Sequence, residues 1–182
     1  GARGLLLTAW GDNGHHPPYA TLYPALILAT AACWGTEIST FELEGAIDAV
    51  FYKDSESASS NGAALCKLGA IDAMLPQPAL PNSFLHSAYF ANDSELELLL
   101  KRTTTQRLEQ VFTVLKEIEA EALDAEIQLS IELSLAAVER CLGRQLITKD
   151  YNRLLDRFKS IWLQSSRTGG LNESLQALKR QA

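Results

Sequence analysis

The sequence predicts a mainly α-helical protein that begins with a single β-strand and helix. Residues 4–10 form a short, continuous apolar run that stops at turn residues, which is typical of a strand buried on both faces. The later apolar segments instead repeat their apolar side chains at the i, i+3, i+4, i+7 spacing of one helix face. We therefore expect a strand–helix unit in residues 1–38 and an α-helical domain in residues 39–182.

Composition indicates a globular protein and excludes several functional classes. The chain has 182 residues, of which 47% are hydrophobic and 21% are charged. Its net charge of −6 argues against broad contact with nucleic acid or an anionic membrane. No apolar run reaches the roughly 18 residues of a membrane span. The three cysteines, Cys33, Cys66 and Cys141, are too few and too scattered for a disulfide framework or a zinc site, so we expect no metal and no cofactor.

The predicted strand has no partner elsewhere in the sequence. It ends at the turn of residues 11–14, and a helix is predicted over residues 21–34 with Pro24 in its first turn. A strand that is apolar on both faces needs neighbouring strands to pair its backbone groups. We therefore expect the chain to be the tail of a larger α/β protein, with Gly1 at a cut end.

Helix signals follow along the rest of the chain. Ser39 and Glu42 have the spacing of a capping box for a helix that ends near residue 52. A short helix is predicted over residues 63–75, followed by a proline-rich connector. Residues 82–142 contain neither glycine nor proline, and Gly143 is a natural stop. Apolar stripes mark the helices in this span and in the next one: Leu108, Val111, Phe112, Leu115, Ile118 and Ala122; Ile127, Ile131, Leu135, Val138 and Leu142; Tyr151, Leu154, Leu155, Phe158, Ile161 and Trp162.

Candidate binding residues follow the predicted strand, where parallel α/β folds bind their ligands. The Trp10 ring can cover the apolar face of a pyranose, and the Asp12 carboxylate can accept hydrogen bonds from its hydroxyls. Asn13 and His16 are weaker candidates. The alternatives are a buried tryptophan over a tight turn and, for His15 and His16, a solvated loop.

A family resemblance adds to this pattern. Residues 8–14, Thr-Ala-Trp-Gly-Asp-Asn-Gly, followed by a proline-containing loop and an Ala/Leu-rich helix, resemble the last strand and helix of the catalytic barrel in glycoside hydrolase family 20. The similar members are β-N-acetylhexosaminidases with a helical C-terminal domain. Residues 161–174 resemble a second signature near their C-terminus, with Thr168 where these proteins usually have proline. The resemblance implies one βα unit from the end of a (β/α)8 barrel, followed by an α-helical domain.

The resemblance also implies site roles. Trp10 would line the −1 sugar subsite, and Asp12 would contact the 4- and 6-hydroxyls, at a position where many members carry glutamate. In this family the 2-acetamido oxygen of the sugar attacks the anomeric carbon, oriented by an aspartate, while the neighbouring glutamate is the acid/base. No Asp-Glu dipeptide occurs in the sequence. We therefore expect no catalytic residue here, and no activity from this chain alone, although the full-length protein would remove terminal N-acetylhexosamine from glycans.

Two other interpretations stay open. The chain could be a stand-alone helical interaction module without catalytic activity, whose N-terminal strand docks onto a partner's sheet edge. In the second interpretation, the chain belongs to a related glycosidase family that acts on a different sugar. We expect no nucleic-acid or membrane partner, a helical domain that braces the barrel and is a candidate surface for a homodimer, and a cytoplasmic location because the cysteines are free.

Overall fold

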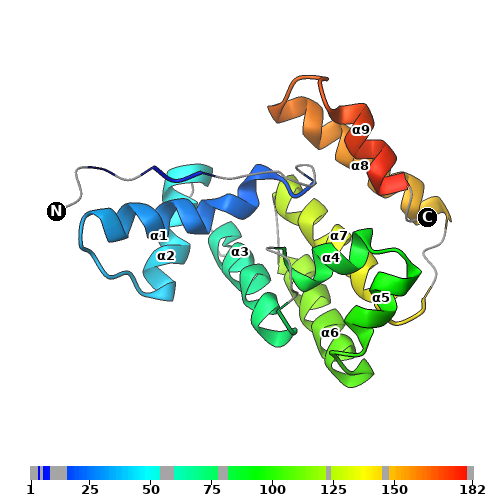
Figure 1. The fold of residues 1–182 in the computed structure, drawn as a ribbon. Helices are drawn as coiled ribbons and strands as arrows, with labels where there is room; N and C mark the ends of the chain where they lie inside the picture. The colour runs from blue at the N-terminus through cyan, green and yellow to red at the C-terminus, as the bar shows by residue number, and fades with distance from the viewer. Residues whose placement is uncertain are drawn as a thin grey trace.

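The computed structural model describes residues 4, 6–8, 16–53, 60–77, 82–121, 124–144 and 148–179. These residues fold into helices joined by short connections (Figure 1). The prediction of a mainly α-helical protein is confirmed. None of the helices within these ranges is long and apolar enough to cross a lipid bilayer.

The β-strand predicted over residues 4–10 is not supported. Within that span the described residues are 4 and 6–8, and they belong to no strand or helix. The side chains of Leu6 and Leu7 are 85% and 47% exposed. The physical reason is the missing pairing, because a strand buried on both faces needs adjacent strands and the described part of the chain contains none. Nothing therefore supports a complete βα barrel unit within this chain.

The helix predicted after that segment does form. A 3-10 turn, η1 (Tyr19–Leu22), leads into α1 (Tyr23–Cys33), which has Pro24 in its first turn as predicted. A proline is tolerated there because its missing N–H would have had no intrahelical partner. Helix α1 packs against α2 (Thr40–Ile47) and α3 (Asn61–Ala70).

The capping box predicted at Ser39 is confirmed. The Ser39 Oγ accepts from the Glu42 N–H, and the Glu42 carboxylate accepts from the Ser39 N–H at 2.8 Å. Helix α2 continues as a π-helical segment, η2 (Asp48–Tyr52), and ends near residue 52 as expected. Helix α3 continues as a 3-10 turn, η3 (Ile71–Met74).

The start of α3 is held tightly against the end of α2. The Asp48 carboxylate accepts hydrogen bonds from the Ser60 hydroxyl at 2.5 Å and from the Gly62 N–H at 2.8 Å. A Cβ atom on Gly62 would lie 2.2 Å from the carbonyl oxygen of Glu44, far inside van der Waals contact. Only glycine at position 62 permits this approach of the two backbones.

The span without glycine or proline forms four helices: α4 (Phe84–Phe90), α5 (Asp93–Leu100), α6 (Thr105–Glu121) and α7 (Ala125–Cys141). The predicted stripes of α6 and α7 provide buried residues of the core, and Gly143 follows α7 in the left-handed conformation with φ of 68°. The break between α4 and α5 was not predicted. It occurs at Asn92, whose side chain forms a second capping box with Glu95.

Helix α7 is the centre of the molecule, in contact with α3, α4, α6 and α8 (Thr148–Ser165). Its Arg140 guanidinium donates to the carbonyl oxygens of Ala88 and Tyr89 at 2.8 and 2.9 Å through Nη1, and to that of Ala91 at 2.7 Å through Nη2. These three carbonyls lie at the C-terminal end of α4, where the last carbonyl oxygens have no N–H donor within the helix. One side chain of α7 therefore caps α4.

The C-terminal helices α8 and α9 (Leu171–Lys179) form a hairpin beside α7 (Figure 1). The Tyr151 hydroxyl donates to the carbonyl oxygen of Leu178 at 2.7 Å, and the Trp162 Nε1 donates to that of Arg167 at 2.7 Å. The predicted apolar face of α8 is buried at Tyr151, Leu154, Leu155, Phe158 and Ile161.

Candidate functional site

The structure describes one of the four predicted sugar-binding residues. Trp10, Asp12 and Asn13 lie outside the described residues, so their predicted roles stay predictions. His16 is described and is only 3% exposed. The expectation that it sits in a solvated loop is wrong. Its ring centroid is 4.4 Å from that of Phe90 and 6.1 Å from that of His86.

The segment after His16 explains this burial. The Ala20 N–H donates to the Glu126 carboxylate at 2.9 Å, which ties the segment to the start of α7. The chain therefore passes over α7 before α1 begins, and His16 is carried into the ring cluster of His86 and Phe90. His86 packs among these rings, with its ring centroid 4.8 Å from that of Phe90.

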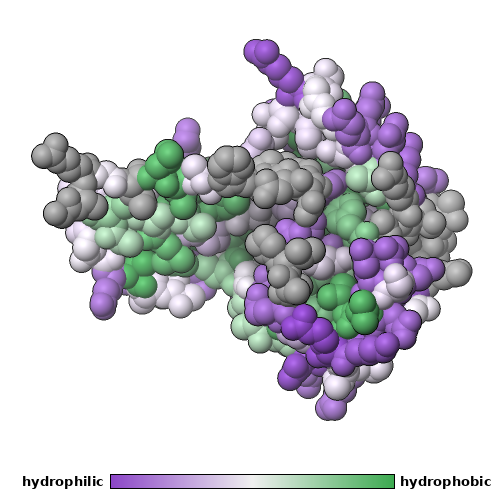
Figure 2. All heavy atoms as spheres, in the orientation of Figure 1, coloured by the Kyte–Doolittle hydropathy of each residue, from purple (hydrophilic) through white to green (hydrophobic). Residues whose placement is uncertain are grey.

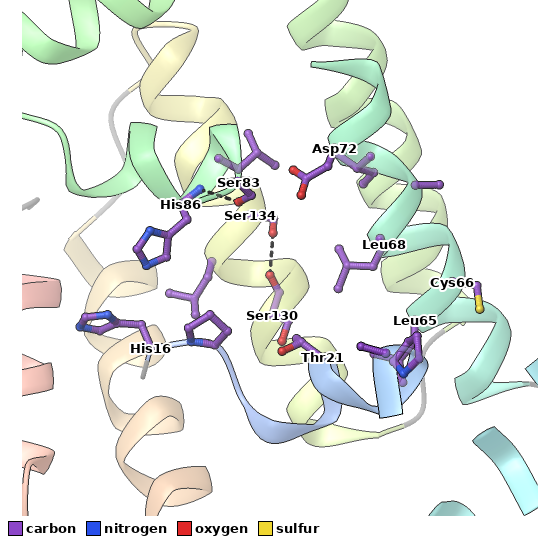
Figure 3. A pocket seen from close by; sticks show the side chains of 18 of the residues that line it. His16, Thr21, Leu65, Cys66, Leu68, Asp72, Ser83, His86, Ser130 and Ser134 are labelled. Carbon is purple, nitrogen blue, oxygen red and sulfur yellow. Dashed lines mark hydrogen bonds between the residues drawn. The ribbon is translucent and has the colours of Figure 1, made fainter. Parts of the chain in front are cut away.

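A cavity of about 720 Å³ lies beside this ring cluster. Its walls come from α1, from α3 and η3, from α4 and from α7, so segments far apart in the sequence enclose it (Figure 3). This volume is within the range of about 300 to 1,000 Å³ that is usual for small-molecule sites. Apolar side chains make up most of the wall, including Ala25, Leu28, Leu43, Leu65, Leu68, Ile71, Leu85, Phe90 and Leu133.

The polar part of the lining combines one charged side chain, Asp72, with uncharged polar ones such as Ser83 and Ser134. Figure 3 shows the Asp72 carboxylate pointing from the η3 side toward Ser83 and Ser134 on the opposite wall. The Ser134 hydroxyl donates to the Ser130 carbonyl oxygen at 2.8 Å, and the Ser83 hydroxyl accepts from the His86 N–H at 3.1 Å. Among the described residues of the lining, Asp72 is the one carboxylate, and none is a lysine or arginine.

Burial changes the protonation of two lining groups. Loss of solvent raises the pKa of the Asp72 carboxyl, because water no longer fully stabilises its charged form. The same cause lowers the pKa of His86, whose Nδ1 is buried without a hydrogen-bond partner in the described structure. The Asp72 carboxylate forms no ion pair or hydrogen bond with the described residues, so no partner offsets the rise in its pKa.

The lining chemistry suits binding. His86 is held as the neutral imidazole at neutral pH. Burial also raises the pKa of the Cys66 thiol, which keeps the less reactive protonated form. Within the described ranges, no three His, Cys, Asp or Glu side chains gather closely enough to hold a metal ion. A mostly apolar molecule with one polar group fits this set of side chains.

A second feature is the exposure of α1 and α2. Helix α1 has the sequence Tyr-Pro-Ala-Leu-Ile-Leu-Ala-Thr-Ala-Ala-Cys and contains no buried residue. Trp34 and Phe41, which lie between the two helices in sequence and at the start of α2, are 83% and 84% exposed. Leu26, Leu28 and Val50 are also exposed. Figure 2 shows apolar side chains gathered over the part of the molecule that α1 and α2 form.

Comparisons of the chain with known protein families, with curated protein sequences and with solved structures found no match.

Sequence reasoning missed the cavity and the position of Asp72. One signal was available, because Asp72 is the only charged residue between Leu68 and Pro81. A lone charge within an apolar stretch indicates a carboxylate close to the protein interior. The opposite wall, from α4 and α7, depends on tertiary packing that no local pattern reveals.

Proposed function

We propose that this chain is the C-terminal portion of a β-N-acetylhexosaminidase-like glycosidase of family 20. The observation that carries the proposal is α1, which is apolar around its whole circumference and yet has no buried residue. A helix that is apolar on all sides is typical of a protein interior. In a (β/α)8 barrel, the helix after the last strand packs against the sheet and against neighbouring helices. The exposed side chains of α1 fit a helix whose barrel neighbours belong to another part of the polypeptide.

The resemblance at residues 8–14 supports the same proposal and supplies the site roles. Trp10 stacks on the sugar in the −1 subsite and forms one wall of the acetamide pocket, so that the acetamide oxygen is aligned with the anomeric carbon. Asp12 accepts hydrogen bonds from the 4- and 6-hydroxyls, and Asn13 follows it in the same turn. We leave His16 out of this subsite because its ring is buried against Phe90. The aspartate and glutamate that complete the reaction lie on earlier strands, outside this chain.

The helical region then acts as a brace. Helix α1 is fixed to the rest of the chain through α2 and α3. The Tyr23 ring of α1 stacks on the Phe51 ring at a centroid distance of 3.8 Å and an interplanar angle of 3°. A barrel helix held in this way restricts the position of the strand before it, and with it the position of Trp10. We also propose a cytoplasmic location, because Cys33, Cys66 and Cys141 are all free thiols.

The test is made on the longer reading frame that contains this chain. We expect an upstream Asp-Glu pair after a predicted strand, and hydrolysis of 4-nitrophenyl N-acetyl-β-glucosaminide by the complete protein. The Trp10→Ala variant should lower kcat/KM by about 100-fold, because both alignment and packing of the sugar are lost. The Asp12→Asn variant should lower it by about 10- to 100-fold on the same substrate, and much less on the 4-deoxy or 6-deoxy sugar.

Matched controls separate these effects from general damage. Asp156 is exposed on α8, so Asp156→Asn should leave kcat/KM unchanged. Turnover above background by the purified 182-residue chain would contradict the proposal, because that chain has no Asp-Glu pair. A start codon immediately upstream of Gly1 in the gene would contradict it as well.

The second candidate is an interaction module without catalytic activity, favoured by the exposed apolar residues of α1 and α2. In that case a separate protein binds to the exposed apolar residues of α1 and α2. The upstream reading frame distinguishes the two, since a partner protein would be encoded elsewhere.

A further inference from the structure

The cavity between α1, α3, α4 and α7 has no part in the proposed glycosidase function, and its lining poses a separate physical problem. Asp72 places a half-buried carboxylate in a mainly apolar wall, with no cationic side chain among the described lining residues. Removing a charged group from water is costly unless a partner of opposite charge compensates it. None of the described lining residues is a lysine or arginine, so the part of the chain that the structure describes does not supply that partner.

We propose that this cavity binds a small hydrophobic amine, with its ammonium group at the Asp72 carboxylate and its hydrocarbon body along the apolar walls. The body would lie between Leu65 and Leu68 of α3 on one side and Leu133 of α7 on the other, all of which line the cavity. Figure 3 shows Asp72 at one side of this space and the rings of His16 and His86 at another, so the charged and apolar parts of the wall are separated.

The lining selects against the other two charge types. An anion would meet the Asp72 carboxylate and find no lysine or arginine among the lining residues. A neutral molecule of the same shape would gain the same apolar burial and leave the carboxylate without a counter-charge. An ammonium group gains a charge-assisted hydrogen bond in addition to that burial, and such bonds are about twice as strong as neutral ones. The amine is therefore the favoured chemical class.

The neighbouring hydroxyls add acceptors around the ammonium group. The Ser134 hydroxyl is already a donor to the Ser130 carbonyl oxygen, and its own oxygen retains acceptor capacity. The Ser83 hydroxyl lies on the same wall, opposite Asp72 (Figure 3). An ammonium group has three N–H donors and no acceptor, so a carboxylate facing two hydroxyls matches its requirements.

Isothermal titration calorimetry at pH 7 with octylamine, 1-octanol and octanoate tests the proposal on the 182-residue chain. All three probes are unbranched eight-carbon molecules that differ in the charge of the head group. We expect octylamine to bind about 10-fold more tightly than 1-octanol, and octanoate to bind most weakly. Asp72→Asn should remove the preference for octylamine while 1-octanol binds as before. The control Asp156→Asn, at an exposed site on α8, should keep the preference.

A second variant locates the binding. Ser134→Phe adds a ring inside the cavity, and we expect it to weaken octylamine and 1-octanol alike, with the helical circular dichroism spectrum retained as evidence of folding. Octylamine binding that survives Ser134→Phe would place the amine elsewhere, for example on the exposed residues of α1, and would overturn the proposal. Equal affinity for octylamine and 1-octanol in the unmodified chain, or no binding of octylamine at millimolar concentration, would overturn it too. The glycosidase tests use other residues, so the two proposals fail independently.

Discussion

Helices α1 and α7 are both rich in apolar residues, but they differ in how far their side chains are buried. Helix α1 contains no buried residue, whereas α7 buries side chains along most of its length, from Ile127 to Cys141. Helix α7 has α3, α4, α6 and α8 around it, whereas α1 packs against α2 and α3. Apolar composition alone therefore does not determine burial. Burial requires enough neighbours, and for α1 the described chain does not provide them.

The largest expected effect comes from truncating one leucine on each helix. Leu129 of α7 is buried and Leu26 of α1 is exposed. Leu129→Ala should lower the free energy of unfolding by about 2 to 5 kcal/mol, because it removes buried methylenes and leaves a cavity. Leu26→Ala should lower it by less than about 1 kcal/mol. Urea denaturation followed by circular dichroism measures both. Equal losses would mean that α1 is buried in solution, for example in a dimer.

The attachment of the exposed region to the core depends on the contact between α2 and α3. Gly62→Ala should destabilise the protein by about 2 kcal/mol or more, because its Cβ would collide with the backbone at Glu44. Gly69 lies in the same helix, and a Cβ there meets nothing within 4 Å. Gly69→Ala should therefore stabilise α3 by about 0.5 to 1 kcal/mol. Thermal unfolding of the two variants checks the opposite signs, and a loss for both would contradict the packing described.

The pH dependence of stability reports on the burial of His86, which belongs to α4 and lines the cavity. Burial lowers the pKa of His86 in the folded protein below the ordinary value of about 6.5. As the pH falls through 6.5, the unfolded chain takes up this proton first, so the unfolded state is favoured. The stabilising effect of neutral His86 is present above pH 6.5 and is lost toward its lower folded pKa. His86→Gln should show a smaller fall in Tm between pH 7.5 and pH 5.5 than the unmodified chain, by about 1 to 3 °C. An unchanged fall would show that His86 is solvated.

The smallest effect is expected at Asp72, and its sign is the opposite of the usual one for an acid. Burial raises the pKa of this carboxyl in the folded protein, so its ionisation at neutral pH costs stability. Asp72→Asn should raise Tm at pH 7 by about 1 °C, since solvent screens a half-buried group. Near pH 3 the acid is protonated in both states, and the difference should vanish. A lower Tm for the variant at pH 7 would indicate a stabilising partner for the carboxylate.

Local signals predicted the parts of this fold that depend on short-range chemistry. The capping box at Ser39, the stop at Gly143 and the apolar stripe of α8 are all determined within a few residues, and the structure confirms them. The break at Asn92 was not predicted, although the spacing of Asn92 and Glu95 is as local a signal as the capping box at Ser39.

The candidate site was less predictable than the helices. The sequence predicted a binding site within residues 10–16. Of these the structure describes only His16, which is buried in the interior. The run at residues 4–10 has the composition of a buried strand, but strand formation depends on partners that composition does not supply. In the cavity, Asp72 faces Ser134, which lies some sixty residues further along the chain. This proximity depends on the packing of the helices, and no local sequence pattern predicts it.

The hydrogen bonds of Arg140 to the end of α4 have a consequence for the order of assembly. Helix α4 has seven residues, too few for an isolated helix to persist in water. Its last carbonyls accept hydrogen bonds from a side chain about fifty residues further along the chain, so these bonds form only after α7 has docked. Contacts of such long sequence separation are made late, because chain entropy must be given up before they form. His86, Tyr89 and Phe90 belong to α4, so we expect the wall of the cavity that they build to become ordered late in folding.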